Sequence, residues 1–512
     1  MNFFSSPRRI SMALSILRFT KMFLGVIVLL LSVKYFGTSY ERDSWVISIA
    51  FFGMIIQGAY APINDTFRTR FIYLKSKLGE ADAIKSTNSL LSFFWITFFV
   101  ISIVLFLMKD NIIETITPGF GSNEQRFLTI MIFSLIPYFI FQQLTNILTA
   151  LLNTYESYFY PELISLTASL INILAIILLS SSLGIYSLVL ATSINGFILT
   201  TALTILLKKK SLGFSLFSFH DISKAKQFIS FSLPIYLAAF STQIYQMTEK
   251  ATCTKFGTGS VSLFDYARQI MNLPWVVFSA IIPLVLTPLL SKCFIDKDEK
   301  TFSIELRRFT RMLMFFSILI AVIMIANNEQ FSFLFFNERD QEFENILVFL
   351  GITINFIILG LICGQSLIAE NRIKHYVIGV VAGNLISMIL CFTFGDSFPL
   401  FSVSIFYLIG QVLTTILLII FLKIFDKRSF ILDVYHLFLT FIGITCITHI
   451  THYFLLSPLI PKNSVISSVS DIILCSILSI LLILSAVFLF NMEEKNIILR
   501  FILKIFKHKT NY

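Results

Sequence analysis

Fourteen stretches of about twenty residues, nearly free of charged side chains, follow one another along this chain. A stretch of this length crosses a bilayer as an α-helix, because about twenty residues at 1.5 Å each cover roughly 30 Å of hydrocarbon. The stretches lie at 11–36, 44–67, 86–108, 127–152, 161–181, 184–207, 227–248, 265–291, 309–327, 345–369, 376–395, 399–422, 434–456 and 469–492. The sequence therefore predicts an all-α polytopic membrane protein with about 14 transmembrane helices.

Composition and charge agree with this prediction. Of 512 residues, 56% are hydrophobic and 13% are charged, which excludes a soluble globular protein. The net charge of +10 would suit nucleic acid, but the basic residues lie in short segments between the apolar stretches. An even number of spans with basic residues in the even-numbered loops predicts that both termini are cytoplasmic. We expect a monomer that binds membrane lipid and no nucleic acid.

The triplet Phe-Gly-Thr occurs twice, at 36–38 and at 256–258, each time between two apolar stretches. A duplicated turn indicates two similarly ordered halves, as in transporters built from repeats. We predict an N-terminal six-helix lobe at 1–210, a C-terminal six-helix lobe at 211–428, and two extra helices with a basic tail at 429–512.

Charged residues in or beside an apolar stretch are costly unless they face water or a partner, so they are candidate site residues. Arg18 and Lys21 are three residues apart on one face of the first predicted helix. They could bind an anion in a cavity or simply extend to the membrane surface.

A second charged group surrounds the second Phe-Gly-Thr triplet. Glu249 and Lys250 precede the triplet, and Asp265 and Arg268 follow it. Asp265 and Arg268 could serve a substrate or form an ordinary surface ion pair with each other.

Other polar residues favour structural roles. Asp65, Arg68 and Arg70 end the second stretch, where we expect a cytoplasmic anchor. Intramembrane amides are expected to bond neighbouring helices; they are Asn153, Asn195, Gln246, Asn355, Asn384 and Gln411.

No motif of nucleotide hydrolysis or nucleophilic catalysis occurs in the sequence, and the six cysteines are scattered without a C-x-x-C pair. We therefore predict that the chain is not an enzyme and holds no metal or other cofactor. A coupling ion is left open.

Four segments resemble the MurJ-type lipid II flippases of the MOP (MATE-like) exporter superfamily. They are GSVSLFDYARQIMNLPWVVFSAIIPLVLTPLLSK at 259–292, ITPGF at 116–120, IPYFIFQQLTNILTALLNTYESYFYP at 136–161 and YFGTSYERDSW at 35–45. The resemblance implies two six-helix lobes around a cavity, with two C-terminal helices that form a groove for the lipid tail. It further implies a flippase of the bacterial cytoplasmic (inner) membrane that carries an undecaprenyl-diphosphate-linked sugar outward by alternating access. The cargo would be lipid II or a related lipid-linked oligosaccharide for peptidoglycan or surface polysaccharide assembly.

The resemblance also implies roles for individual residues. The cations expected to bind the diphosphate are Arg18, Lys21, Lys250 and Arg268, and the supporting residues are Asp43, Glu249, Asp265 and Gln269. Asp43 matches the aspartate of the family's first outer loop. The family's first-span Arg-Asp pair falls on Val28 and Leu29, another first-span arginine falls near Met22, a second-span arginine falls on Ile55 or Ile56, and the eighth-span Asp-Arg falls on Arg268 and Gln269.

Several alternatives stay open on the sequence. Within the same superfamily they are an O-antigen or capsule-type polysaccharide exporter and a small-molecule or cation antiporter. An antiporter would bury an unpaired carboxylate for coupling, and none is evident in the sequence. More remote alternatives are a membrane glycosyltransferase, which would need a long outer loop, and a transport-inactive scaffold.

Overall fold

The regular structure of the chain is helical throughout the part that the computed structural model describes, residues 7–209, 215, 222–423, 426–451 and 465–489. Each of the fourteen predicted stretches is mainly helical over its described residues. Ten of the described helices are long and apolar enough to cross a membrane, and the bent pair α5 and α6 makes eleven. Large apolar side chains such as Phe106 and Leu178 are exposed, as lipid-facing residues are. The prediction of an all-α, multi-pass membrane protein is confirmed.

The chain forms two compact units. Unit 1 comprises Met1–Tyr266 and Asn384–Val403, and unit 2 comprises Ala267–Gly383 and Ser404–Tyr512. The lobe boundaries predicted from the sequence stay a prediction, and most of the basic tail lies outside the described residues.

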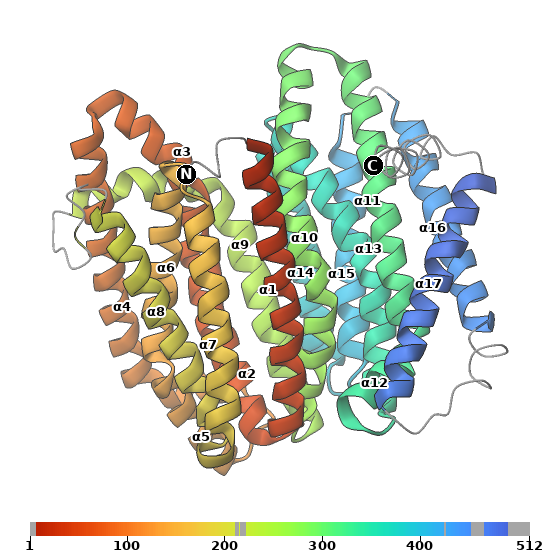
Figure 1. Ribbon diagram of the computed structural model, residues 1–512, viewed down its shortest axis with the longest axis horizontal. Coiled ribbons are helices and arrows are strands. Elements are labelled where there is room, and N and C mark those ends of the chain that lie inside the picture. The colour runs from red at the N-terminus through yellow and green to blue at the C-terminus, as the bar shows by residue number, and fades with distance from the viewer. Residues whose placement is uncertain (1–6, 210–214, 216–221, 424–425, 452–464, 490–512) are drawn as a thin grey trace, which may run out of the picture. The chain divides into compact units, whose positions relative to one another are not determined.

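Unit 1 contains most of the polar side chains discussed below. Its helices are α1 (Pro7–Phe36), α2 (Tyr40–Gly53), the π-helix η1 (Met54–Tyr60), α3 (Ala61–Leu78), α4 (Glu80–Ile116), α5 (Ser122–Ser134), α6 (Ile136–Thr154), α7 (Phe159–Leu183), α8 (Tyr186–Lys209), η2 (Ile222–Ala225), α9 (Lys226–Cys253) and η3 (Thr254–Phe256), with the first residues of α10 (Ser260–Ile295) and the last of α14 (Ile373–Phe394). Helix α7 packs against both α1 and α8, and α8 packs against α6 (Figure 1). These four helices surround the cavity described in the next section.

The second span begins earlier than predicted and contains an irregularity. Helix α2 begins at Tyr40, so Asp43 lies in its first turn and the loop position expected for this aspartate is wrong. The side chain of Ser39 accepts a hydrogen bond from the Arg42 amide and so caps the helix. The π-helix η1 then joins α2 to α3. Single π-helical turns within α-helices are rare and occur often at functional sites.

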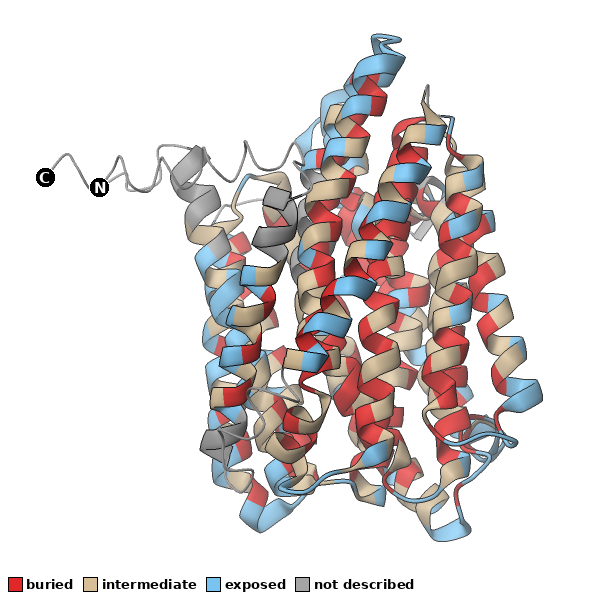
Figure 2. Ribbon diagram, turned by 90° about the vertical axis from the view of Figure 1, so that its right-hand side faces the viewer, coloured by how far each residue is buried: buried red, intermediate tan, exposed pale blue. Residues whose placement is uncertain are grey.

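Among its described residues, unit 2 holds the rest of α10 and α14 together with six further helices. The further helices are α11 (Glu299–Ala326), α12 (Asn328–Phe336), α13 (Gln341–Ala369), α15 (Ser402–Phe421), α16 (Lys427–Thr451) and α17 (Val465–Leu489). Figure 2 shows buried positions recurring along the length of the helices. The Ser317 hydroxyl on α11 donates to the Asn355 carboxamide on α13 at 2.7 Å, which confirms the helix-bonding role predicted for Asn355.

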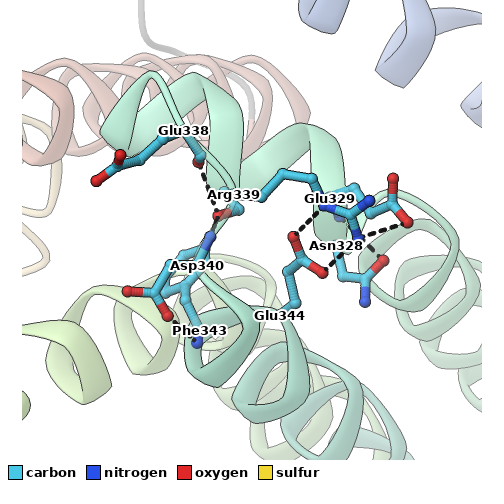
Figure 3. A network of polar contacts seen from close by, with 8 residues as sticks. Asn328, Glu329, Glu338, Arg339, Asp340, Phe343 and Glu344 are labelled. Atoms are coloured by element: carbon cyan, nitrogen blue, oxygen red, sulfur yellow. Dashed lines mark hydrogen bonds and ion pairs between the residues drawn. The ribbon is translucent and has the colours of Figure 1, made fainter. Parts of the chain in front are cut away.

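The turn between α12 and α13 is held by an arginine and two carboxylates (Figure 3). Arg339 donates two parallel hydrogen bonds to Glu344, at 3.0 and 2.9 Å, and pairs with Glu329 at 2.8 Å. The hydrogen bonds to Glu344 raise the pKa of the Arg339 guanidinium above its ordinary value. The pairing fixes where α13 begins, and Asp340 caps that helix by accepting from the Phe343 amide.

The glycine of the ITPGF segment accounts for one close contact in unit 1. A Cβ added to Gly119 would lie 2.6 Å from the Lys255 Cα and closer still to the Thr254 carbonyl. The Gly119 amide also donates to the Thr254 hydroxyl at 3.1 Å. Only glycine permits this approach between the end of α4 and η3.

We predict that Gly119→Ala destabilises the protein by about 1–3 kcal/mol, the usual cost of overpacking a filled site, because backbone atoms must move apart. Thermal unfolding of the detergent-purified protein measures this. Gly53→Ala is the matched control, since nothing lies within 4 Å of a Cβ at that position. Equal melting temperatures for the two variants would contradict the prediction.

Candidate functional site

A polar cavity of about 570 Å³ lies within unit 1. Residues of α1, η1, α3, α6, α7 and α8 line it. Its size is that of an ordinary small-molecule site, about 300–1,000 Å³, although such sites usually have mainly apolar walls. A polar wall inside a membrane bundle indicates a polar ligand or an aqueous path.

Two of the predicted cations line this cavity. Arg18 Nε lies 3.0 Å from Glu162 Oε1, and Lys21 Nζ lies 2.6 Å from Ser165 Oγ. Both partners are on α7, so the two contacts hold α1 against α7. The Arg18 side chain stays half exposed, which leaves most of its donors available to a ligand.

Carboxamides form much of the rest of the wall; they are Gln57, Asn64, Gln142, Asn146, Asn153 and Asn195. Asn64 and Gln143 face each other with both N···O distances at 3.4 Å, and the Asn195 Oδ1 is buried without a hydrogen bond among the described residues. A buried acceptor without a partner is unfavourable unless water or a ligand reaches it. Asn153 and Asn195 thus line a cavity, a role that the sequence did not favour.

Asp65 on α3 is the carboxylate that the sequence analysis assigned to a surface anchor. Its side chain lines the cavity, and no hydrogen bond or ion pair of Asp65 is found among the described residues. The position was missed because Asp65 ends an apolar stretch beside two arginines, a pattern typical of membrane anchors.

A second polar group, here called the turn cluster, consists of Gly37, Arg42, Asp43, Lys250, Gly259, Ser262, Asp265 and Tyr266. At its centre, Asp43 accepts from the Gly259 amide at 2.6 Å, from the Ser262 amide at 2.7 Å and from the Ser262 hydroxyl. Gly259 immediately precedes α10 and has no side chain to cap it, so Asp43 of α2 caps α10 instead. A carboxylate at a helix N-terminus also interacts favourably with the helix dipole.

Arg42, which the sequence analysis passed over, is the buried cation of this cluster. Its side chain is 1% exposed, lies 4.4 Å from the Trp45 ring, and donates to the Tyr266 hydroxyl at 3.2 Å. Asp265 pairs with Arg42 at 3.5 Å and with Lys250 at 3.9 Å. Lys250 is therefore engaged in an ion pair and does not line the polar cavity.

The two Phe-Gly-Thr turns meet in this cluster. Gly37 and Gly257 both have positive φ, 53° and 96°, a conformation that favours glycine. The Tyr266 hydroxyl donates to the Gly37 carbonyl at 2.8 Å, and the Thr38 carbonyl lies against Gly259. The sequence repeat therefore corresponds to two similar turns that pack against each other.

The remaining predicted residues lie in separate surroundings. Glu249 is fully buried in unit 1 and accepts from the Tyr245 hydroxyl at 2.9 Å. Arg268 belongs to unit 2, is 7% exposed, and its guanidinium carbon lies 4.0 Å from the Tyr407 ring centre. Gln269 is half buried. The roles assigned to them, substrate binding for Arg268 and a supporting role for Glu249 and Gln269, stay predictions.

Comparison with known proteins decides the family. The family model described as "Lipid II flippase MurJ" matches residues 32–470. The chain belongs to the lipid II flippase MurJ family. A "Lipid II flippase MurJ" of Burkholderia cenocepacia is 22% identical over 284 residues, which are 53% of this chain and 55% of that protein. The chain thus aligns with little more than half of the length of the curated relatives it matches first.

Solved structures show the fold. A structure of "Lipid II flippase MurJ, inward closed conformation" superposes with a TM-score of 0.76 at 20% identity, covering 95% of this chain and 99% of that one. An inward-facing MATE transporter of the MOP superfamily gives a TM-score of 0.63 at 14% identity, covering 81% and 94%. The resemblance to MurJ-type and MATE-like proteins inferred from sequence is confirmed.

We predict that Asp43→Ala lowers the melting temperature of the purified protein by several degrees, because two backbone amides at the start of α10 lose an ionised acceptor. Hydrogen bonds to a charged group contribute about 1.5–3 kcal/mol each. Glu41→Ala is the matched control, since Glu41 is the other acidic residue in the first turn of α2 and contributes equally to the dipole of that helix. A loss no larger than that of the control would show that the cap does not stabilise the fold.

Proposed function

We propose that this chain is a flippase that moves a prenyl-diphosphate-linked sugar, lipid II or a related lipid-linked oligosaccharide, from the cytoplasmic to the outer leaflet. The observation that carries the proposal is the cavity of unit 1, in which Arg18 and Lys21 lie beside a wall of carboxamides in a chain of the MurJ family. The cations suit a diphosphate, and the carboxamides suit the hydroxyl and amide groups of a sugar.

A diphosphate that crosses hydrocarbon without partners meets a prohibitive barrier, so its path must supply cations and water. Arg18 offers a planar set of donors that can bind two phosphate oxygens at once, and Lys21 adds a compact charge three residues later. The Glu162 and Ser165 contacts hold these side chains in place until a stronger anion displaces them. The prenyl tail would stay in the lipid or in the groove expected at α16 and α17.

Translocation by alternating access requires contacts that break when the cavity changes sides. The turn cluster has the properties of such a closure, since short hydrogen bonds and ion pairs join α1, α2, α9 and α10 at two glycine turns. The proposal includes cytoplasmic termini, residence in the bacterial inner membrane, and a monomer that works without catalysis, a resident cofactor or nucleic acid.

We predict that the double variant Arg18→Gln, Lys21→Gln lowers the flipping rate at least about tenfold, because the loss of two charge-assisted contacts in the cavity exceeds 1.4 kcal/mol. The measurement uses proteoliposomes with fluorescent lipid II, in which a membrane-impermeant quencher reports the outer leaflet.

Arg126→Gln is the control for this variant, because Arg126 is an exposed cation on α5 that does not line the cavity. Unchanged flipping by a correctly inserted double variant would place the diphosphate site elsewhere. The function itself is contradicted if liposomes with the wild-type protein give the same signal as liposomes without it. This must hold both for lipid II and for other prenyl-diphosphate sugars.

A separate prediction concerns Arg268. If this buried guanidinium binds the diphosphate, Arg268→Ala abolishes flipping while the protein stays inserted and abundant, and Arg268→Lys recovers only part, since lysine cannot reproduce the planar fork. If Arg268 instead serves to pack against Tyr407 in unit 2, Arg268→Ala lowers the amount of inserted protein and leaves the flipping rate per inserted molecule nearly unchanged. The flipping rates of the two variants, normalised to the amount of inserted protein, separate these roles.

A further inference from the structure

The formal charges that line the cavity of unit 1 sum to zero. Arg18 and Lys21 are positive, and Asp65 and Glu162 are negative. The other titratable residues on its wall, Tyr138 of α6 and Tyr158 before α7, are neutral phenols, and the residues contributed by η1 and α8 carry no charge. A cavity with this lining has no excess positive charge for an anion.

The two carboxylates differ in their surroundings. Glu162 is held by Arg18 at 3.0 Å, so its charge is already compensated. Asp65 has no hydrogen-bond or ion-pair partner among the described residues, and its carboxylate faces the same space that a ligand would fill. Bringing a doubly charged diphosphate into this space places it beside the like charge of Asp65, which is unfavourable.

We propose that Asp65 takes up a monovalent cation, a proton or Na⁺, when the diphosphate substrate enters the cavity. This inference rests on the proposed function and adds the coupling cation to it. Neutralising Asp65 leaves a net charge of +1 on the lining, because Glu162 still compensates one of the two cations, so cation and anion bind together. Because linkage is reciprocal, the cation raises the affinity for the substrate by the same factor as the substrate raises the affinity for the cation.

The neighbouring groups are suited to this role. Carboxamide and hydroxyl oxygens are the ligands that accompany a carboxylate around a hard cation, and Asn64 lies next to Asp65 in the chain and on the same cavity wall. A proton instead needs only the carboxylate itself. Both sources deliver one positive charge to the same side chain, and the experiment below separates them.

The test measures binding of farnesyl-diphosphate-linked N-acetylglucosamine to the full chain in nanodiscs. One arm varies pH with sodium replaced by choline, and the other varies sodium at a fixed, mildly alkaline pH. If the cation is a proton, wild-type affinity falls about tenfold per pH unit once Asp65 is ionised in the free protein, because one proton is taken up per ligand bound. If it is Na⁺, sodium restores the affinity.

The variant Asp65→Asn keeps the shape of the side chain without its charge, and we expect tight binding that no longer depends on pH or sodium. Asp65→Glu should keep the dependence. Asp82→Asn is the matched control, because Asp82 is an exposed carboxylate of unit 1 that pairs with Lys85 outside the cavity; it should behave as the wild type.

Two results would overturn the inference while the proposed function stands: probe binding by the wild type that is independent of both cations, or a cation dependence that Asp65→Asn leaves intact. A wild-type protein that binds no probe at any pH or sodium concentration contradicts the proposed function and this inference with it.

Discussion

The hydrocarbon core offers no water to a polar group, so such a group in this bundle needs a partner within the protein or in a polar cavity. Most hydroxyls do so inside their own helix. Ser48, Thr252 and Ser366 each donate to the carbonyl four residues earlier, at 2.7, 2.8 and 2.9 Å. Side chains satisfied in this way carry little functional information. Other polar groups have a partner on a different helix or no partner among the described residues. These groups mark the places where a functional role is to be sought.

The turn cluster and the cavity are two such places in unit 1, and they differ in how their charges are compensated. In the turn cluster, Asp43 and Asp265 are each matched by donors from another helix, and the cluster is largely sealed from solvent. These buried hydrogen bonds and ion pairs favour one arrangement of the helices, and they break only when the helices move. In the cavity, Arg18 and Asp65 keep exposed polar atoms. The first arrangement suits a closure and the second suits a ligand, so the two sites divide conformational control and recognition between them.

The sequence was sufficient for what depends on local pattern. Apolar length predicted the helices, the repeated Phe-Gly-Thr predicted two equivalent turns, and the spacing of Arg18 and Lys21 placed them on one face of a helix. The sequence was insufficient for charged residues whose interaction partners lie far away along the chain. The charged segment around Arg42 and Asp43 resembles a loop, yet it forms the first turn of a buried helix because Asp265 and Ser262, more than two hundred residues later, compensate its charges. Asp65 was missed for the same reason, since α1, α6, α7 and α8 together create the space it faces.

The departures from the family pattern can now be considered as changes in charge. Replacing the first-span Arg-Asp pair by Val28 and Leu29 removes one charge of each sign and leaves the balance unaltered. By the same resemblance, the arginine expected in the second span falls on Ile55 or Ile56, which removes a positive charge. The charged residues on the described wall of the cavity, Arg18 and Lys21 beside Asp65 and Glu162, supply no excess positive charge in its place. A chain with these changes can still carry such an anion if a mobile cation replaces the fixed positive charge. Transport in this member of the family would then depend on the cation concentration on the side from which the substrate enters.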